Sequence, residues 1–529
     1  MTLSSASQQN TQPASQKLRQ PQPGCAGWRD WLALGLLMFP VLLVAVDNTA
    51  LTFALPAIAR SLETTGVQLL WIVDAYPLVL AGLLVAMGSL GDRIGRRRLL
   101  LTGSVGFAAV SAATAFAPSA EWLIAGRAAL GFFGAMLMPS TLSLIRNIFP
   151  DPNRRRLAIA IWAAGFSGGA ALGPIFGGWL VEEFWWGAIL LVAVPIMLPL
   201  LVFGPAFIPE SKDPRPGRLD VPSIVLSMLV MVPVVYGIKE LATKGFGAGP
   251  AAPIVFGLAM GFVFVRRQHR LASPLLDMSL FGNRVFSTAI TANILALFSF
   301  NGFILFLAQH LQLLDGMTPS GAGVAMIPAL VATVVAGLAV VPLVRRVRPG
   351  FVVAGGLAMS AAGYGLVVFG DHTAGPVLLL AALLILALGV GAAETISNDL
   401  ILGSVPAEKS GAAAAISETG YEVGSLMGTA VLGSILTASY QHNLRLPAGL
   451  EDTASPHTVQ QAGETLAGAM ELAAGLPGPL GEALRGAARL AFDSGVHITA
   501  AIALVLMAGA AVLTAVVLRK IPTAAPAER

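Results

Sequence analysis

Long apolar runs fill most of this chain, and each is about as long as a lipid bilayer is thick. Only 11% of the residues are charged, against about 25% in soluble domains, so most of the surface must face lipid. A helix of about 20 residues spans the hydrocarbon core. On that criterion the sequence predicts fourteen membrane-spanning helices, near residues 30–55, 68–90, 98–117, 121–147, 157–181, 186–207, 220–240, 250–267, 286–312, 320–344, 350–369, 375–401, 411–438 and 496–518.

The basic residues concentrate in every second connection between these runs. If the N-terminus is cytoplasmic, 25 of the 32 Lys and Arg residues fall on the cytoplasmic side, as expected because basic loops resist translocation. Arg127 falls within a span, and six others, including Lys239 and Lys244, fall on the far side. An odd number of spans would break this alternation, so we expect both termini in the cytoplasm.

A weak internal repeat predicts the division into domains. Asp92-Arg93-Ile94 and Arg345-Arg346-Val347 are 253 residues apart, and each stands in a basic hairpin between two spans. We expect two six-helix bundles and two inserted helices between them, as in repeat-built transporters that bind substrate near mid-bilayer. The predicted parts are a disordered tail at 1–28, the first bundle at 29–210, the inserted helices at 219–268, the second bundle at 285–519, and a C-terminal tail at 520–529.

One long connection, residues 440–495, falls on the outer side. Its prolines separate two segments with helical periodicity, 457–474 and 480–492. The sequence predicts an extracellular helical hairpin, and the alternative is a flexible loop. Cys25 is the only cysteine, so an intrachain disulfide and a cysteine-based metal site are both excluded.

The stretch Gly88–Leu101, GSLGDRIGRRRLLL, stands between the second and third spans. It resembles the conserved loop between helices 2 and 3 of the major facilitator transporters. In that superfamily the loop is a conformational latch, and a generic basic hairpin is the alternative reading. The matching positions are Gly88, Leu90, Asp92, Arg93, Gly95, Arg96 and Arg97.

Two further stretches narrow the resemblance. Residues 44–62, VAVDNTALTFALPAIARSL, resemble the first-span motif of the fourteen-helix drug:proton antiporters, and residues 165–180, GFSGGAALGPIFGGWL, resemble their antiporter motif. The chain is thus similar to the Qac-type and Smv-type exporters of quaternary ammonium compounds and viologens. This resemblance implies a bacterial inner-membrane transporter that acts as a monomer, is driven by the proton motive force and has no bound cofactor.

The antiporter motif also has a physical pattern. Small residues recurring every four positions form one stripe on a helix, which lets a second helix approach closely. Ordinary tight packing is the alternative to a role in antiport. The residues concerned are Gly165, Gly169, Gly173, Pro174, Gly177 and Gly178.

Charged residues inside the spans carry the functional prediction. A charge at the bilayer centre costs about 2.5 to 3.5 kcal/mol on insertion scales, so such residues are functional by default. Their positions predict an outer tier of Asp47, Asp74 and Arg127 and an inner tier of Glu394, Glu418 and Glu422, with Asp399 near an edge.

Glu418 and Glu422 are four residues apart and therefore share one face of a helix. Two close carboxylates in a low dielectric do not both ionise cheaply, so one should hold a proton that an arriving cation displaces. The pair resembles the acidic pair of helix 13 in the Qac-type exporters. The alternative is a buried acid held by hydroxyl groups.

Asp74 is the predicted substrate contact, because Trp71 shares its helix face and Tyr76 is nearby. An aromatic ring beside an acid attracts a delocalised cation, although Trp71 also suits the membrane interface. Arg127 resembles the helix 4 arginine that these antiporters use in proton transfer. We expect it to pair with Asp74 or Asp47, and a purely structural ion pair is the alternative.

These features predict a proton-coupled exporter of lipophilic mono- and divalent cations, such as quaternary ammonium compounds, dyes, biguanides and viologens. The alternative is export of a neutral or anionic metabolite, lipid or siderophore. An anion carrier should show unpaired basic residues, whereas these spans hold one arginine against six acids. The scattered histidines and the absence of GxxxxGK[ST] argue against an enzyme, a metal site or a nucleotide-driven pump. We expect no nucleic-acid partner.

Overall fold

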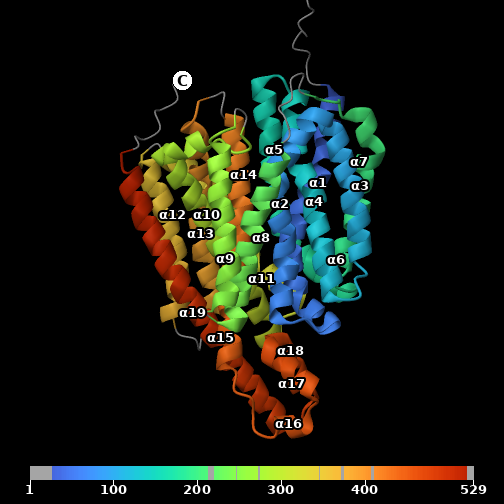
Figure 1. The fold of residues 1–529 in the computed structure, drawn as a ribbon, viewed down its shortest axis with the longest axis vertical. Helices are drawn as coiled ribbons and strands as arrows, with labels where there is room; N and C mark the ends of the chain where they lie inside the picture. Colours follow the sequence, from blue (N-terminus) through green and yellow to red (C-terminus); the bar gives the residue numbers. More distant parts are fainter. Residues whose placement is uncertain are drawn as a thin grey trace, which may run out of the picture.

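The computed structural model describes residues 27–212, 220–245, 247–271, 274–344, 346–370, 375–406 and 410–520. Within these ranges every regular element is a helix (Figure 1). The predicted N-terminal tail lies outside the described residues up to position 26, as does Cys25. The predicted C-terminal tail lies outside from position 521 onward.

The first bundle forms around one hydrophobic core. Leu37, Phe107 and Phe149 are among its fully buried members. Several helices begin at side-chain caps, such as Thr65 before α2 and Ser119 before α4, which satisfy backbone N–H groups that the helix leaves free. Its helices are α1 (Trp28–Leu62), α2 (Gly66–Ile94), α3 (Arg96–Thr114), α4 (Ala120–Ile148), α5 (Pro152–Glu183), α6 (Ala188–Leu191) and α7 (Ala193–Phe207).

The second bundle has its own core, which includes Phe303, Phe306, Tyr364 and Phe492. Its helices are α10 (Arg284–Gln309), continued by the π-helical turn η2 (His310–Leu314), α11 (Pro319–Leu343), α12 (Pro349–Phe369), α13 (Pro376–Gly403), α14 (Ser410–Met427), continued by the π-helical turn η5 (Gly428–Leu432) and by α15 (Gly433–Asn443), and α19 (Gly478–Leu518). The short helix η1 (Met278–Gly282) precedes α10.

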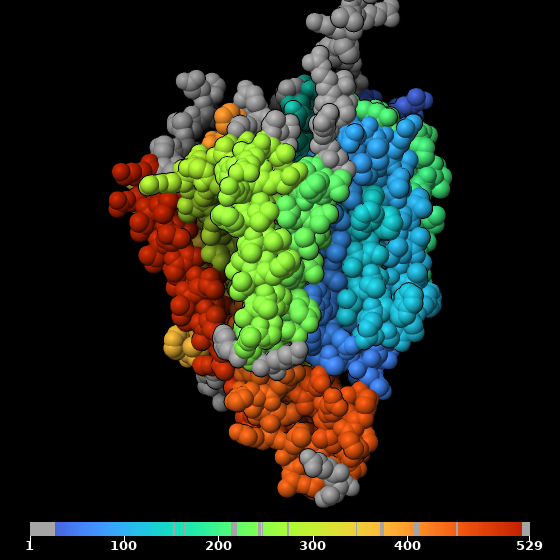
Figure 2. All heavy atoms as spheres, in the orientation of Figure 1, coloured from blue at the N-terminus to red at the C-terminus, as the bar shows by residue number. Residues whose placement is uncertain are grey.

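Helices α8 (Val221–Lys244) and α9 (Ala248–Gln268) pack against each other and cover the seam between the two bundles in Figure 2. Only 17% of the residues in the most apolar stretch of each helix are buried. The exposed faces of α8 and α9 therefore suit a lipid environment. Leu78 of α2, Val235 of α8 and Leu426 of α14 share one small cluster, which places α8 against both bundles.

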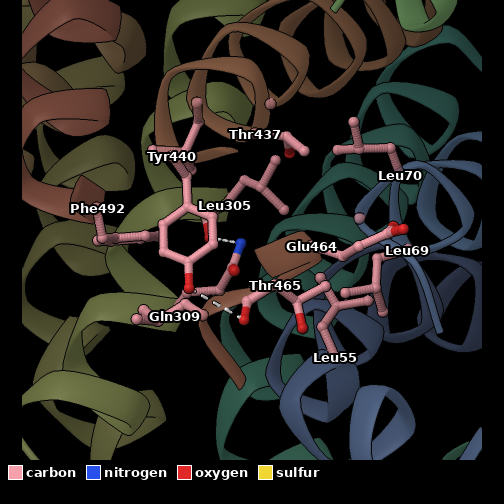
Figure 3. A pocket seen from close by; sticks show the side chains of 14 residues that line it. Leu55, Leu69, Leu70, Leu305, Gln309, Thr437, Tyr440, Glu464, Thr465 and Phe492 are labelled. Carbon is pink, nitrogen blue, oxygen red and sulfur yellow. Dashed lines mark hydrogen bonds between the residues drawn. The ribbon is translucent and has the colours of Figure 1, made fainter. Parts of the chain in front are cut away.

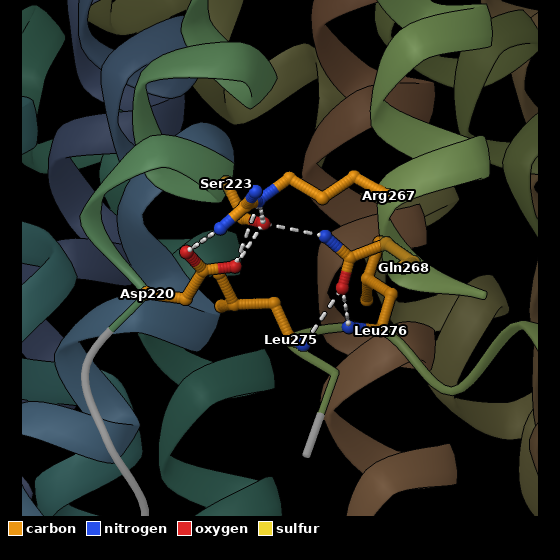
Figure 4. Close-up of polar contacts among 6 residues, drawn as sticks. All are labelled: Asp220, Ser223, Arg267, Gln268, Leu275 and Leu276. Atoms are coloured by element: carbon orange, nitrogen blue, oxygen red, sulfur yellow. Dashed lines mark hydrogen bonds and ion pairs between the residues drawn. The ribbon is translucent and has the colours of Figure 1, made fainter. Parts of the chain in front are cut away.

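A polar network ties the start of α8 to the end of α9 (Figure 4). Arg267 lies 2.7 Å from Asp220, and Gln268 donates a hydrogen bond of 2.7 Å to the hydroxyl of Ser223. The side-chain oxygen of Gln268 also accepts the backbone N–H of Leu275 at 2.8 Å. The two inserted helices are therefore clamped at this end.

Three short helices form a cap beyond the bundles: α16 (Leu450–Thr453), α17 (Pro456–Glu464) and α18 (Leu466–Gly475). Both segments predicted as helical, 457–474 and 480–492, are largely helical. The predicted separation of residues 480–492 from the last span is wrong, because they belong to α19, a single helix of 41 residues. After Pro479 no proline interrupts the chain up to Leu518, so nothing separates this segment from the last apolar run.

The two ends of the molecule differ in character. The start of α1 and the end of α19 lie at one end, together with the stretch Gly88–Leu101, and we call this the basic end. The opposite end carries α16–α18, and we call it the cap end (Figure 1).

Twelve of the described helical segments are long and apolar enough to cross a membrane. Helices α3 and α5 pack within the first bundle but are not among the twelve. The 19 residues of α3 begin with three arginines, which lowers its apolar content. The count of fourteen spans therefore stays a prediction.

The close packing of α12 on α13 provides a test of the fold. A Cβ atom on Gly356 would lie 2.5 Å from the carbonyl oxygen of Gly389, whereas one on Gly355 would have no neighbour within 4 Å. We expect Gly356→Val to lower the apparent melting temperature of the purified protein by about 1 to 3 °C, because overpacking costs about 1 to 3 kcal/mol and 1 kcal/mol is worth about 1 °C in a chain of this length. Gly355→Val is the matched control, and an equal effect of the two substitutions would contradict this packing.

Candidate functional site

Two buried ion pairs lie in the part of the molecule where α1, α2, α4 and α8 come together. In the first, Arg127 of α4 lies 2.7 Å from Asp47 of α1, and the side chains are 2% and 5% exposed. The guanidinium also donates a hydrogen bond of 3.3 Å to the carbonyl of Ile72. Of the two partners predicted for Arg127, the structure therefore selects Asp47.

The aromatic ring of Tyr76 completes this first pair. It lies 4.7 Å from the Arg127 guanidinium and is fully buried. Gly131 and Gly134 of α4 allow this approach, because a Cβ on Gly131 would lie 2.5 Å from the carbonyl oxygen of Tyr76. The ring predicted to contact substrate thus covers the protein's own arginine.

The second pair joins Asp74 of α2 to Lys239 of α8 across 2.9 Å, and the two side chains are 0% and 1% exposed. The hydroxyl of Thr429, in η5, donates a hydrogen bond to the same carboxylate. Asp74, on a helix of the first bundle, is therefore contacted by the second bundle and by an inserted helix.

Trp71, one turn before Asp74, stacks on this lysine. The Lys239 ammonium lies 4.0 Å from the ring centroid of Trp71, and Tyr236 lies 6.4 Å from that ring. The sequence predicted a cation at this acid and this ring. In the structure the cation is a residue of the chain itself.

Sequence reasoning missed Lys239, which it assigned to the outer loop because the apolar run ends near residue 240. Helix α8 continues to Lys244, and the lysine faces inward. A signal was present in the spacing: Ser227, Met231, Val235 and Lys239 recur every four residues, and the first three pack toward α2. Extending that stripe by one turn places Lys239 inside.

The three glutamates of the inner tier come from α13 and α14. Glu422 is 3% exposed, and Glu418 and Glu394 are half-buried. The carboxylate of Glu418 is close enough to those of Glu394 and Glu422 for the charges to repel one another. Among the described residues, no Lys or Arg nitrogen lies within 4.0 Å of these three carboxylates. Asp399 is exposed.

The two tiers approach each other at Tyr76. Its hydroxyl is close enough to Asp47, Arg127 and Glu422 to feel the charge of all three. Among the described residues this buried hydroxyl has no hydrogen-bond partner. The outer pair and Glu422 of the inner tier therefore both lie near this one tyrosine.

The glycine stripe of α5 packs against α1, the helix that carries Asp47. A Cβ on Gly169 would lie 2.9 Å from that of Ala45, and one on Gly177 would lie 2.6 Å from that of Ala50. Gly165 and Gly173 likewise face Met38 and Thr49 of α1. The stripe therefore fixes the position of Asp47.

The other residues of this motif face the second bundle. A Cβ on Gly178 would lie 2.5 Å from the backbone nitrogen of Ser320, and the carbonyl of Pro174 contacts Gly323 of α11. The hydroxyl of Ser320 donates a hydrogen bond of 2.6 Å to Glu182. These contacts join the bundles toward the cap end.

The latch stretch is held at the basic end by its own bundle. Asp92 lies 2.8 Å from Arg96. Arg97 donates hydrogen bonds to the carbonyls of Pro205 and Ile208, at the end of α7, and lies 3.8 Å from Glu210. Gly95 has φ +112°, a value that L side chains rarely adopt. Gly88 lies near Pro139, and Arg93 is exposed. Among the described residues, the hydrogen bonds and ion pairs of this stretch therefore stay within the first bundle and the segment that directly follows α7.

A small pocket with a cavity volume of about 40 Å³ lies between the bundles and the cap (Figure 3). It is lined mainly by apolar side chains, including Leu70, Leu305 and Phe492. Tyr440 points across it and donates a hydrogen bond of 2.9 Å to the carbonyl of Ala462, in the cap. The buried acids described above do not line this cavity.

Two helical bundles, apolar helices long enough to cross a bilayer and paired charges in their interior define a multi-pass membrane transporter. The chain belongs to the major facilitator superfamily, whose family model matches residues 37–429. This match identifies the chain as a transporter and not an enzyme.

Two relatives cover nearly the whole chain. The multidrug efflux pump LfrA of Mycolicibacterium smegmatis is 52% identical over 492 residues, 93% of this chain and 97% of that protein. The methyl viologen resistance protein SmvA of Salmonella typhimurium is 36% identical over 467 residues, 88% of this chain and 93% of that protein.

Solved structures share the fold. A bacterial homologue of the human lysosomal transporter Spinster, in an inward-facing and unoccupied conformation, has a TM-score of 0.65 and 19% sequence identity. The match covers 94% of this chain and 99% of that one. A POT family transporter has a TM-score of 0.61 at 12% identity, covering 92% and 96% of the two chains.

The buried pair of Asp47 and Arg127 generates a stability prediction. Arg127→Met leaves a buried carboxylate unpaired, so we expect a loss of about 3 kcal/mol or more and a clear fall in melting temperature. The double variant Asp47→Asn/Arg127→Met removes both charges and should recover most of that loss. Arg489→Met, in a half-exposed pair with Asp493, is the control and should cost less than about 1 kcal/mol. A double variant no more stable than Arg127→Met would contradict the pairing.

Proposed function

We propose that this protein exports lipophilic cations in exchange for protons. The balance of buried charge supports the proposal most directly. Arg127 and Lys239 are each neutralised by one aspartate, which leaves Glu394, Glu418 and Glu422 as carboxylates without a cation among the described residues. Such a site has a deficit of positive charge that a proton or a cationic substrate supplies.

The exchange follows from the spacing of these acids. Three neighbouring carboxylates in a low dielectric do not all ionise, because each charge disfavours the next. A lipophilic cation that enters from the basic end compensates the charge that a proton compensated before, and the proton leaves. Each inward proton supplies about 2.3 kcal/mol per 100 mV of membrane potential, so no nucleotide or bound cofactor is required.

The names of two relatives support the proposed class of exported molecule. One is named as a multidrug efflux pump and another as a methyl viologen resistance protein, and methyl viologen is an aromatic dication. We propose the same class for this chain: quaternary ammonium compounds, dyes, biguanides and viologens.

For its cellular setting, we propose a monomer in the bacterial inner membrane. The basic end would lie in the cytoplasm, because basic loops resist translocation. The cap formed by α16–α18 would then lie outside.

The alternative cargo is a neutral or anionic metabolite, lipid or siderophore. Lys239 gives this alternative more weight than the sequence did, because the interior holds two basic residues and not one. Both basic residues are paired within 3 Å, however, so neither is free to bind an anion. The charge balance therefore favours a cation.

The test uses the purified full chain in sealed vesicles with a pH-sensitive dye. Adding a quaternary ammonium compound should release protons from vesicles that contain the parent protein. Glu418→Gln and Glu422→Gln should each lower that release at least about tenfold, since the amide of glutamine neither binds nor releases a proton near neutral pH. Glu482→Gln, which removes an exposed acid of α19, should leave it unchanged. The proposal fails if the parent protein moves no protons in response to the cation.

A further inference from the structure

Lys239 makes the contacts that a lipophilic cation would make. Its ammonium lies 2.9 Å from a carboxylate and 4.0 Å from the centroid of an indole ring, with a second aromatic ring beside the first. An acid combined with aromatic faces is the usual chemistry for binding an organic cation. The side chain thus occupies a cation site that would otherwise be free.

The ammonium is held less completely than the other buried cation. Of its three N–H donors, none has a well-aligned acceptor among the described residues, even though Asp74 lies within ion-pair distance. Arg127 by contrast reaches a carboxylate, a backbone carbonyl and an aromatic ring. Buried donors left unsatisfied weaken a contact, so the Lys239 pair is the one that a competing cation can break.

The acid itself stays in place when the lysine leaves. Asp74 is one of the buried residues of α2, and its carboxylate also accepts a hydrogen bond from the hydroxyl of Thr429. The ammonium of Lys239 is carried by a flexible four-carbon side chain. The residue lies five positions before the end of α8, a helix that is mostly exposed on the surface of the molecule. The site therefore consists of a fixed acid and ring with a movable cation.

We propose that Lys239 is a tethered cation that occupies the Asp74–Trp71 site in the absence of cargo, and that the exported cation displaces it. This inference rests on the proposed function above. It makes Lys239 a specificity-determining residue: a cargo must bind this site better than an ammonium already there, whereas a neutral or anionic molecule gains nothing by displacing it. It also assigns a role to α8, which loses its ion pair with α2 of the first bundle when cargo arrives.

The experiment measures binding of tetraphenylphosphonium to the purified full chain by equilibrium dialysis. A site that is free for only a small fraction of the time binds with an apparent Kd raised by the inverse of that fraction. We therefore expect Lys239→Met to lower the Kd by at least about tenfold. Lys239→Gln, which keeps a polar side chain but removes the positive charge, should also lower the Kd. Lys212→Met removes an exposed lysine and is the matched control, with an unchanged Kd.

A double substitution separates this inference from a structural role. Asp74→Asn should weaken binding, and Asp74→Asn/Lys239→Met should bind like Asp74→Asn alone, because the lysine matters only through that acid. An unchanged or higher Kd in both Lys239→Met and Lys239→Gln would overturn the inference, whatever their melting temperatures. If the parent protein and all variants bind no tetraphenylphosphonium, the proposed function fails first, and the two failures are thereby distinguished.

Discussion

A charge placed in a low-dielectric interior must be compensated, and the arrangement of this protein follows from how it meets that requirement. Two buried ion pairs within the chain meet it: Asp47 with Arg127, and Asp74 with Lys239. A third group of carboxylates on α13 and α14 has no basic partner among the described residues. The first two are neutral within the chain itself, whereas the third needs a positive charge that comes from outside the chain.

The helices that bring these groups together are positioned by small residues and not by the charges. The glycine stripe of α5 sets the distance to α1 and thereby the position of Asp47. Gly131 of α4 admits the backbone of α2 beside Tyr76. Close helix packing of this kind requires shape complementarity, which does not depend on protonation. The scaffold can therefore stay constant while the protonation of its acids changes.

Much of the fold and of the candidate site could be predicted from the sequence, because the length of an apolar run and the position of a charge within it depend only on neighbouring residues. Spans, basic loops, the Gly88–Leu101 motif and the buried acids can each be read from local composition. Lys239 could not be placed in the same way, because its burial depends on which helix covers it, and α8 packs on residues more than a hundred positions away. The choice of Asp47 over Asp74 as the partner of Arg127 likewise depends on helix rotation. The continuity of α19 was missed because a change from polar to apolar residues is not a helix break.

The length of α19 couples the two faces of the molecule. Its 41 residues make a rod about 60 Å long, which starts in the cap and ends where Arg348 donates a hydrogen bond of 2.8 Å to the carbonyl of Arg519. A single unbroken helix therefore joins the cap to the basic end, so residues on opposite faces of the molecule belong to one hydrogen-bonded element of the second bundle.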